Sequence, residues 1–479
     1  MSNASSSNAH PIWSLVEAAA PRLVDLSHKV WATPETCYAE RQSVAAHAEE
    51  LRAQGFDVTE TPAGIPTAVI GEAGSGGPVI AFLGEFDALA GLSQQADVDE
   101  QAPLEDGANG HGCGHNLLGS ASMLAAVAVR DWLKETGTPG TVRYYGCPAE
   151  EGGAGKTFMV RDGLFSDVDI AITWHPNSLP IILKGSSLAN TRVDYTFTGR
   201  AAHAAGAPHL GRSALDAMEL MNIGVNYLRE HMPDSARVHY AIIDGGGISP
   251  NVVQSRAKVR YVIRSETVPE MLNLIERVNK VADGAALMTE TSVTKEVLAA
   301  VSNLVPNRPL WEAMQKNYET LGPVPFDAED EEYAARFQAT LSPEDIANAW
   351  RSAGLTARPG KILADFVPPA DAPAVPLGGS SDVADVSWVV PTVQLMDATS
   401  AIGTQLHSWQ MVAQGKSSPS AKGMIHAAQV MAMTGVDVIL DAGLREQAWA
   451  DLRARGGAEG YICPLTAEAV PPVKAMAAE

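Results

Sequence analysis

The chain has 479 residues, of which 46% are hydrophobic, and it carries a formal net charge of -22 at pH 7. A chain of this length allows two or three domains of about 150 residues, each with its own hydrophobic core. The excess of acidic side chains argues against nucleic acid or an anionic membrane surface as a partner, because both would repel the protein.

The cysteines and the apolar segments indicate where the protein acts. Residues Cys37, Cys113, Cys147 and Cys463 are far apart and form no disulfide framework, so a reducing compartment is expected. No apolar run approaches the roughly 18 residues of a transmembrane helix. Residues 1–10 lack a basic segment followed by an apolar one, which is typical of a disordered lead and not of a signal peptide. We therefore expect a cytoplasmic protein.

Helix and strand patterns alternate over the first part of the chain. Apolar spacing and turn residues predict helices over 12–26 and 41–55, strands over 67–70 and 79–83, a helix over 117–133, a strand over 141–146, a helix over 158–163 and a strand over 169–175. Such alternation indicates an α/β domain with a mostly parallel sheet. In sheets of this kind, ligands bind at the carboxyl ends of the strands.

A different order of elements follows. The patterns predict a strand over 191–198, a helix over 213–231, strands over 238–243 and 257–265, a helix over 269–287 and a strand over 291–297. This β-α-β-β-α-β order is that of a ferredoxin-like unit. Beyond it, we expect helices over 310–318, 343–350, 423–433 and 444–452, and strands over 386–390 and 393–395. Residues 1–190 and 303–479 should therefore form one α/β domain, with residues 191–302 inserted as a separate unit.

A thiol and an imidazole lie together just before the helix expected over 117–133. In the segment Gly-His-Gly-Cys-Gly-His-Asn, residues 110–116, glycine lets the backbone bend so that Cys113 and His115 can reach one metal ion. By itself, the segment is also compatible with a buried cysteine beside surface histidines. Further residues of metal-binding type occur downstream: Glu150, Glu151, His175 and His407.

Five side chains are of types that hold zinc or a similar divalent ion: Cys113, His115, Glu151, His175 and His407. Five ligands are too many for one tetrahedral ion that keeps an open position. A pair of ions about 3.5–4 Å apart fits better, with one ligand bridging them. We expect Cys113 to be the bridge.

Glu150 is the candidate general base. Neighbouring side chains of an extended chain point to opposite sides, so Glu150 and Glu151 should have different roles. We assign Glu151 as a ligand and Glu150 as the base, and later the acid, beside a metal-activated water. An exposed acidic turn is the alternative interpretation of this pair.

Together these segments resemble the aminoacylase/carboxypeptidase family of dinuclear metallohydrolases, and within it the branch of p-aminobenzoyl-glutamate hydrolases and auxin-conjugate amidohydrolases. The matching segments extend over nearly the whole chain: 110–116, 148–155, 173–175, 199–208, 251–264, 378–382 and 406–409. The resemblance implies a metal-bearing α/β domain with an inserted lid that commonly mediates dimerisation. It therefore implies a homodimer formed through the lid, with a related second subunit as a further partner to consider.

The resemblance also implies roles for single residues. The five candidate ligands and Glu150 fall on positions that resemble the family's metal ligands and catalytic carboxylate. Many relatives have a histidine ligand where Glu85 stands, and Cys113 and His115 replace that arrangement here. Asp87 resembles a residue that orients a metal ligand.

Substrate-binding positions are implied in the lid and after a proline-rich linker. His203 resembles a histidine that reaches the neighbouring subunit's site and stabilises the oxyanion. Asn251 and Arg264 resemble substrate-binding residues, and a guanidinium is a good bidentate partner for a carboxylate. A cradle for a carboxylate is implied by three further residues: Gly379, Ser380 and Ser381.

The expected reaction is hydrolysis of the amide bond of a small N-acyl amino acid such as p-aminobenzoyl-glutamate, with two zinc or manganese ions activating water. Indoleacetyl-aspartate, other aromatic acyl-amino acids and dipeptides are alternative substrates. Two other hypotheses stay open: Cys113 as a covalent nucleophile, and a catalytically silent protein that binds acyl-amino acids. Trp174 and Trp409 either wall an aromatic pocket or pack in the core.

Overall fold

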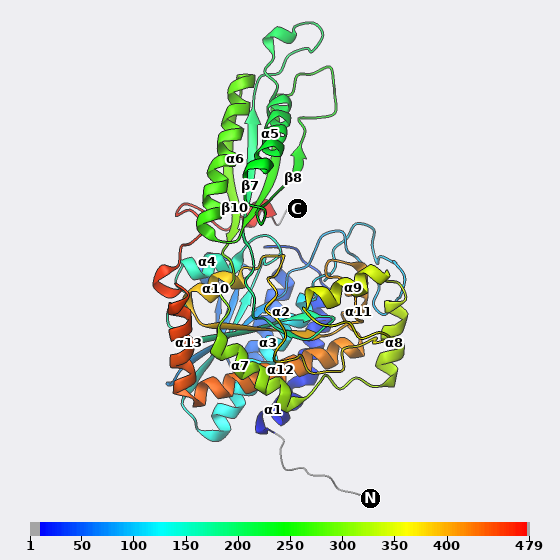
Figure 1. Cartoon of the computed structure of the whole chain (residues 1–479), viewed down its shortest axis with the longest axis vertical. Coiled ribbons are helices and arrows are strands. Elements are labelled where there is room, and N and C mark those ends of the chain that lie inside the picture. The colour runs from blue at the N-terminus through cyan, green and yellow to red at the C-terminus, as the bar shows by residue number, and fades with distance from the viewer. Residues whose placement is uncertain (1–9, 477–479) are drawn as a thin grey trace, which may run out of the picture.

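The computed structural model describes residues 10–476. It has a broad α/β body and a long, narrow lid that rises from one side of the body (Figure 1). The segment 1–9, most of the expected disordered lead, lies outside the described residues.

A seven-stranded sheet forms the centre of the body. Its strands are β1 (Asp57–Glu60), β2 (Val69–Ser75), β3 (Val79–Glu85), β4 (Gly140–Cys147), β5 (Ile170–Asn177), β6 (Ile181–Ile182) and β11 (Thr392–Ala398). They are arranged in the order β1-β2-β4-β3-β5-β11-β6. The four central strands β4, β3, β5 and β11 run parallel, whereas β1, β2 and β6 pair antiparallel towards the edges. The expected α/β class with a parallel core is confirmed.

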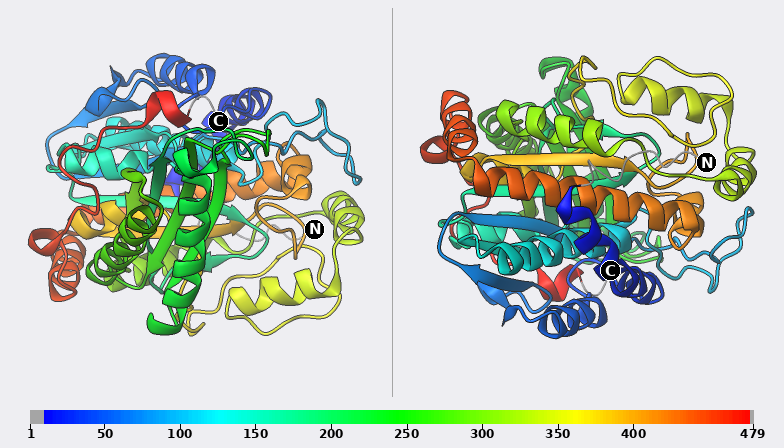
Figure 2. Two further views of the ribbon diagram at one scale, coloured as in Figure 1. Left: turned by 90° about the horizontal axis from the view of Figure 1, so that it is seen from above. Right: turned by 90° about the horizontal axis from the view of Figure 1, so that it is seen from below.

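Helices cover both faces of this sheet. One face carries α1 (Pro11–Trp31), α3 (His115–Thr136), α7 (Arg308–Leu321) and α12 (Ser418–Leu440), and the other carries α4 (Gly155–Arg161) and α10 (Val383–Val389). Alternate residues of β3 enter the two cores: Ile80 and Phe82 pack in the first, Ala81 and Leu83 in the second. Figure 2 shows α3 and α12 running side by side, in contact with each other. This two-faced burial explains why the central strands are almost wholly apolar.

Helix α12 requires a correction to the expectation that no apolar segment reaches membrane-spanning length. By length and composition alone it is apolar enough to cross a membrane. Within the structure, however, 83% of its apolar window is buried. It packs against α3, β5 and β11, as a core helix does.

Close approach between α3 and β3 depends on one glycine. A Cβ atom at Gly119 would lie 2.5 Å from the backbone oxygen of Glu85. The contact is with main chain, which cannot move aside without shifting the strand that carries Glu85. The glycine therefore helps to set the distance between the helix that begins at His115 and the strand that ends at Glu85.

We expect Gly119→Ala to lower the free energy of unfolding by about 1–3 kcal/mol, the usual cost of overpacking a core. The control is Gly284→Ala in the lid helix α6 (Val268–Thr289), where an added Cβ meets no atom within 4 Å. That change should raise the free energy of unfolding by about 0.5–1 kcal/mol, because alanine is the better helix former. Urea titration of both variants measures the two effects, and equal effects would contradict the packing argument.

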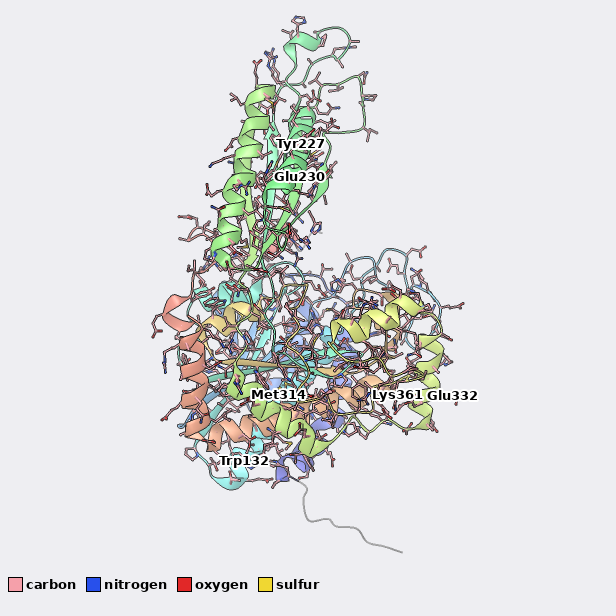
Figure 3. The ribbon with its side chains drawn as sticks, in the orientation of Figure 1. Trp132, Tyr227, Glu230, Met314, Glu332 and Lys361 are labelled. Atoms are coloured by element: carbon pink, nitrogen blue, oxygen red, sulfur yellow. The ribbon has the colours of Figure 1, made fainter. Side chains whose placement is uncertain are left out.

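The lid is built from β7 (Ala189–Thr198), α5 (Ala214–Leu228), β8 (Arg237–Asp244), β9 (Arg256–Ser265), α6 (Val268–Thr289) and β10 (Ser292–Val301). Its four strands form an antiparallel sheet in the order β10-β7-β9-β8. Both helices pack on one face of this sheet, over a core that includes Tyr195, Phe197 and Tyr261. Tyr227, labelled in Figure 3, lies on the outer side of α5 and is 74% exposed. The order of elements is β-α-β-β-α-β, as the sequence predicts.

The body contains one wrong secondary-structure prediction and several unexpected elements. The valine-rich segment 386–390, predicted as a strand, belongs mostly to α10, whose buried residues pack against α4 and so override the strand preference of valine. Helix α8 (Ala328–Gln338) is too charged to show apolar spacing, and a capping box formed by Asp327 and Asp330 begins it. Helix α9 (Pro343–Ser352) lies where expected. The remaining body helices are α2 (Arg41–Ala53), α11 (Trp409–Gln414) and α13 (Ala442–Ala454).

Candidate metal centre

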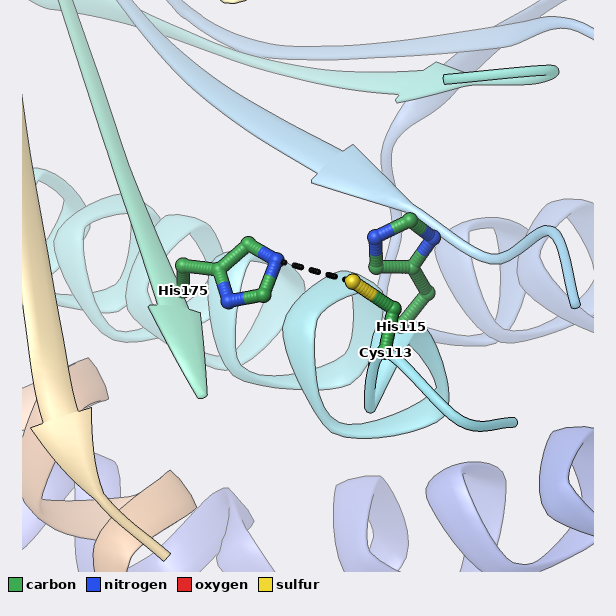
Figure 4. A group of neighbouring side chains, drawn as sticks. All are labelled: Cys113, His115 and His175. Atoms are coloured by element: carbon green, nitrogen blue, oxygen red, sulfur yellow. Dashed lines mark hydrogen bonds between the residues drawn. The ribbon is translucent and has the colours of Figure 1, made fainter. Parts of the chain in front are cut away.

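The side chains of metal-binding type gather where the parallel strands end. Each strand contributes a nearby segment: Glu85 and Asp87 at β3, Glu150 and Glu151 after β4, His175 in β5 and His407 beyond β11. The start of α3 adds Cys113 and His115, which point toward His175 in Figure 4. The carboxyl edge of the sheet is therefore the site, as expected for an open α/β sheet.

These side chains form two groups that share Cys113. In the first group, ligand atoms of Cys113, His115 and His175 all lie within 4.8 Å of one another. The Cys113 Sγ atom is 3.4 Å from Nε2 of His175 (Figure 4). In the second group, ligand atoms of Cys113, Glu151 and His407 lie within the same limit, and Nε2 of His407 is 3.3 Å from Oε2 of Glu151.

The donor atoms suit a pair of divalent cations. Nε2 of His115 and Oε1 of Glu151 are buried and have no hydrogen-bond partner. A buried polar atom left without a partner costs free energy, so each of these atoms is available to coordinate a cation. A thiolate, imidazoles and a carboxylate are the donors preferred by zinc and similar ions. The residues therefore fit a metal site.

Asp87 connects the two groups. Its Oδ1 atom accepts a hydrogen bond from Nδ1 of His115 at 2.9 Å, and its Oδ2 atom accepts one from the backbone N–H of Glu151 at 2.9 Å. The first bond places the ring proton on Nδ1 of His115, which leaves Nε2 as the electron-pair donor. One carboxylate thus orients a residue of each group.

Glu150 lies beside the first group, with Oε2 at 4.0 Å from Nε2 of His115. The chain is not extended here, because Ala149 has φ +59° and a turn follows β4. The argument that an extended backbone separates Glu150 from Glu151 is therefore wrong. The turn separates them instead, with Glu150 facing His115 and Glu151 facing His407.

The two glutamates also differ in their electrostatic surroundings. Burial raises the pKa of Glu150 well above its usual range, and the carboxylates of Glu85 and Glu151 raise it further. Burial alone would raise the pKa of Glu151 too, but hydrogen bonding to His407 and the nearby His115 lower it to about 2. Glu151 is thus the better anionic ligand, and Glu150 the better proton carrier.

A buried lysine holds Glu85 at the edge of the centre. Nζ of Lys156 is 2.5 Å from Oε1 of Glu85 and 2.7 Å from Oδ1 of Asp382, and all three side chains are almost completely buried. Burial would lower the pKa of Lys156, but Asp382 and Glu85 raise it well above its usual value. The other oxygen of Glu85 lies 3.3 Å from Nε2 of His115. Lys156 is therefore a fixed cation directly behind the metal-binding side chains.

A cleft of about 420 Å³ opens over the centre, between the body and the base of the lid. Cys113, Glu150 and His407 lie in its wall on the body side. On the lid side, Nη1 of Arg264 donates a hydrogen bond to Oγ of Ser380 at 2.8 Å. A separate pocket of about 680 Å³ is lined by residues such as Trp388 and contains no histidine, cysteine or carboxylate. The smaller cleft is therefore the candidate site.

Residues 81–344, more than half of the chain, match a sequence model described as "Peptidase family M20/M25/M40". The chain belongs to this family. It is therefore a metal-dependent hydrolase that acts on amide bonds.

Similar proteins agree with the family assignment. The M20/M25/M40 chain is 46% identical over 466 residues to one of the p-aminobenzoyl-glutamate hydrolase subunits of Escherichia coli (strain K12), covering 95% of this chain and 97% of that protein. It is 30% identical to the Xaa-Arg dipeptidase of Mus musculus, with 90% and 89% of the two chains covered. Its fold resembles Bacillus subtilis YXEP, described as a dinuclear metal-binding peptidase, with a TM-score of 0.54, 17% identity, and 88% and 99% of the two chains covered.

Not all candidate residues of this M20/M25/M40 peptidase lie at the cleft. Arg264, Gly379, Ser380 and Ser381 line it, whereas His203 and Asn251 are exposed in lid loops outside its lining. Those two loops meet through a bridge between His203 and Val252. Within one protomer, the structure does not bring His203 to the metal-binding side chains.

Three residues of the site have no role in the sequence-based assignment. Glu85 enters it only as a replaced ligand, and Lys156 and Arg192 do not enter it, although both line or support the cleft. A lysine placed just after Glu150-Glu151 and an arginine on the first lid strand are the available signals. Trp174 is fully buried, with its indole N–H bonded to the Leu118 carbonyl oxygen, and neither it nor Trp409 lines the cleft.

Proposed function

We propose that this peptidase hydrolyses the amide bond of an N-acyl amino acid, with p-aminobenzoyl-glutamate as the first candidate. The observation that carries the proposal is a single cleft that contains metal-binding side chains, Glu150 and the Arg264–Ser380 pair. The 46% identical relative, named for p-aminobenzoyl-glutamate, supports this choice. Indoleacetyl-aspartate and other aromatic acyl-amino acids are alternative substrates of the same chemical class.

The metal ions would be held by the two groups described for the centre. Cys113 would bridge them, because it belongs to both groups. His115 and His175 would complete one site, and Glu151 and His407 the other. When bound, zinc or manganese supplies a Lewis acid that lowers the pKa of a water from about 15.7 toward 7.

The chain's own residues would then carry out the proton transfers. Glu150 accepts the proton of the attacking water and later gives it to the leaving amine. Asp87 keeps the His115 ring in the orientation that leaves Nε2 available. Both steps need the separation between Glu150 and Glu151 that the turn at Ala149 provides.

The substrate carboxylate would be bound on the opposite wall of the cleft. The Arg264 guanidinium offers two parallel N–H donors, and Ser380, Ser381 and the backbone of Gly379 lie beside it. His203 would stabilise the oxyanion, and Asn251 would contact substrate, from the lid of a neighbouring subunit. Their distance from the cleft within one protomer supports a role across an interface.

We propose that residues 191–302 act as a lid and dimerisation domain between body segments 1–190 and 303–479. Strand β8 lies at the edge of the lid sheet and exposes Ile242 and Ile243 there. An open edge with apolar side chains supports pairing with a second copy. A related second subunit is the alternative partner, since the similar Escherichia coli protein is named as one subunit of its hydrolase. We propose a cytoplasmic location, with all four cysteines free.

Metal removal tests the mechanism. Treatment with EDTA should abolish hydrolysis of p-aminobenzoyl-glutamate, and zinc or manganese should restore it, because neither half of the centre can activate water without an ion. The measurement is the rate of release of p-aminobenzoate, with each metal added to apoenzyme in turn. Activity that persists in EDTA but is lost on alkylation of Cys113 would favour the thiol nucleophile instead.

A dipeptidase is the second candidate function. The Mus musculus relative, 30% identical, is named Xaa-Arg dipeptidase, which favours a dipeptide substrate. A panel of N-acyl amino acids and dipeptides assayed with the metal-loaded protein separates the two functions. Binding of these compounds without any turnover would support a catalytically silent binding protein.

A further inference from the structure

Two arginines project from the lid sheet into the same cleft. Arg192 on β7 and Arg264 on β9 both line it. In the sheet register, Arg264 is opposite Asn190, and Arg192 is opposite Val262. The two arginines are therefore diagonal neighbours on one face, about 7–8 Å apart along the sheet.

The two guanidinium groups occupy different parts of the cleft. A methyl group at Gly152 would collide with the guanidinium of Arg192, so this group lies against the turn that carries Glu151. The guanidinium of Arg264 lies instead against the hydroxyl of Ser380. One cation thus borders the metal-binding side, and the other borders the Gly379–Ser381 side.

Each arginine affects the other. Burial lowers the pKa of Arg264, and the positive charge of Arg192 lowers it further. The ion pairs found in the described part of the chain give Arg264 no carboxylate partner, and its neighbour Ser380 is uncharged. Two like charges brought together in a half-buried cleft are best stabilised by a ligand that carries two negative charges.

We infer that Arg192 is a specificity-determining residue that binds a second, side-chain carboxylate, so that the leaving amino acid is a dicarboxylate. This inference rests on the proposed function, in which Arg264 binds the carboxylate common to all amino acids. Glutamate and aspartate place their two carboxylates on one short carbon chain, in reach of two neighbouring guanidinium groups. An arginine or other cationic side chain at this position would instead be repelled by Arg192.

The test compares p-aminobenzoyl-glutamate with p-aminobenzoyl-glutamine, which has the same size but one charge fewer. We expect wild-type holoenzyme to prefer the glutamate compound in kcat/KM, and Arg192→Gln to reduce that preference by about 100-fold, the value of a charge-assisted hydrogen-bonded pair. Arg264→Gln should lower kcat/KM for both compounds alike. Arg192→Lys should keep part of the preference, because the charge remains.

Arg256→Gln is the matched control, since Arg256 lies on the same strand as Arg264, is exposed and does not line the cleft. It should leave the preference unchanged. If Arg192→Gln lowers kcat/KM for both compounds equally, Arg192 only supports the turn at Gly152 and the inference is wrong.

Calorimetric binding of free glutamate and glutamine gives a second readout that needs no turnover. Wild-type protein should bind glutamate more tightly, and Arg192→Gln should remove most of the difference. Holoenzyme that hydrolyses both compounds equally well would overturn the dicarboxylate inference while leaving the proposed function intact. Holoenzyme that hydrolyses neither compound would overturn the proposed function, and the calorimetric ratio would still decide whether Arg192 selects a dicarboxylate.

Discussion

Replacement of Glu150 by glutamine lowers kcat for amide hydrolysis by about 1,000-fold or more, within the upper range for loss of a general acid–base group. Glutamine keeps the size and the hydrogen-bonding shape of the side chain but cannot accept and return a proton. Because the five proposed ligands are unchanged, the variant should retain two metal ions per chain. The rate of p-aminobenzoate release and the metal content of the same preparation measure the two properties.

The neighbouring residue supplies the matched control. Glu151→Gln also removes one carboxylate from the same turn, but it removes a proposed ligand that lies 3.3 Å from His407. This variant should lose metal as well as activity, whereas Glu150→Gln loses activity alone. If Glu150→Gln kept more than about a tenth of the activity, or if it lost metal as Glu151→Gln does, the division of roles would be wrong.

Replacement of Lys156 by methionine lowers the free energy of unfolding by about 3–5 kcal/mol, the usual cost of removing one partner from a buried ion pair. Methionine fills a similar volume but leaves the carboxylates of Glu85 and Asp382 buried together without a cation. Repulsion should also displace Glu85 from its place beside His115, so metal affinity should fall along with stability. Urea unfolding of the apoprotein and metal titration of the folded protein measure these effects.

Lys361→Met is the control for loss of a lysine. Lys361, labelled in Figure 3, pairs with Asp365 at the surface, where the two side chains are 36% and 40% exposed. A pair exposed to water contributes little, so this change should cost less than about 1 kcal/mol. Equal costs for the two lysines would mean that the buried cluster of Lys156, Glu85 and Asp382 does not stabilise the body.

Much of the site could be predicted because its residues follow regular elements. His175 ends a plainly apolar strand, and Cys113 and His115 precede a plainly apolar helix, so the carboxyl edge of a parallel sheet had to bring them close. The spacing of Glu150 and Glu151 after β4 carries the same information. Residue types and strand ends therefore identify the centre before any coordinates are known.

The residues that support the centre could not be predicted in this way. Lys156 is buried only because Asp382, which is distant in sequence, reaches it from the start of α10. That helix has the sequence pattern of a strand, since valine-rich segments favour strands until packing against α4 decides otherwise. The position of His203 depends on the length and direction of the lid, and local patterns do not contain that information.

The most direct test of the account is a crystal structure of the metal-loaded protein with anomalous scattering recorded at the metal absorption edge. We predict two peaks about 3.5–4 Å apart on either side of Cys113, one near His115 and His175 and the other near Glu151 and His407. A single peak, or peaks that leave His175 or His407 outside coordination distance, would contradict the paired-ion centre.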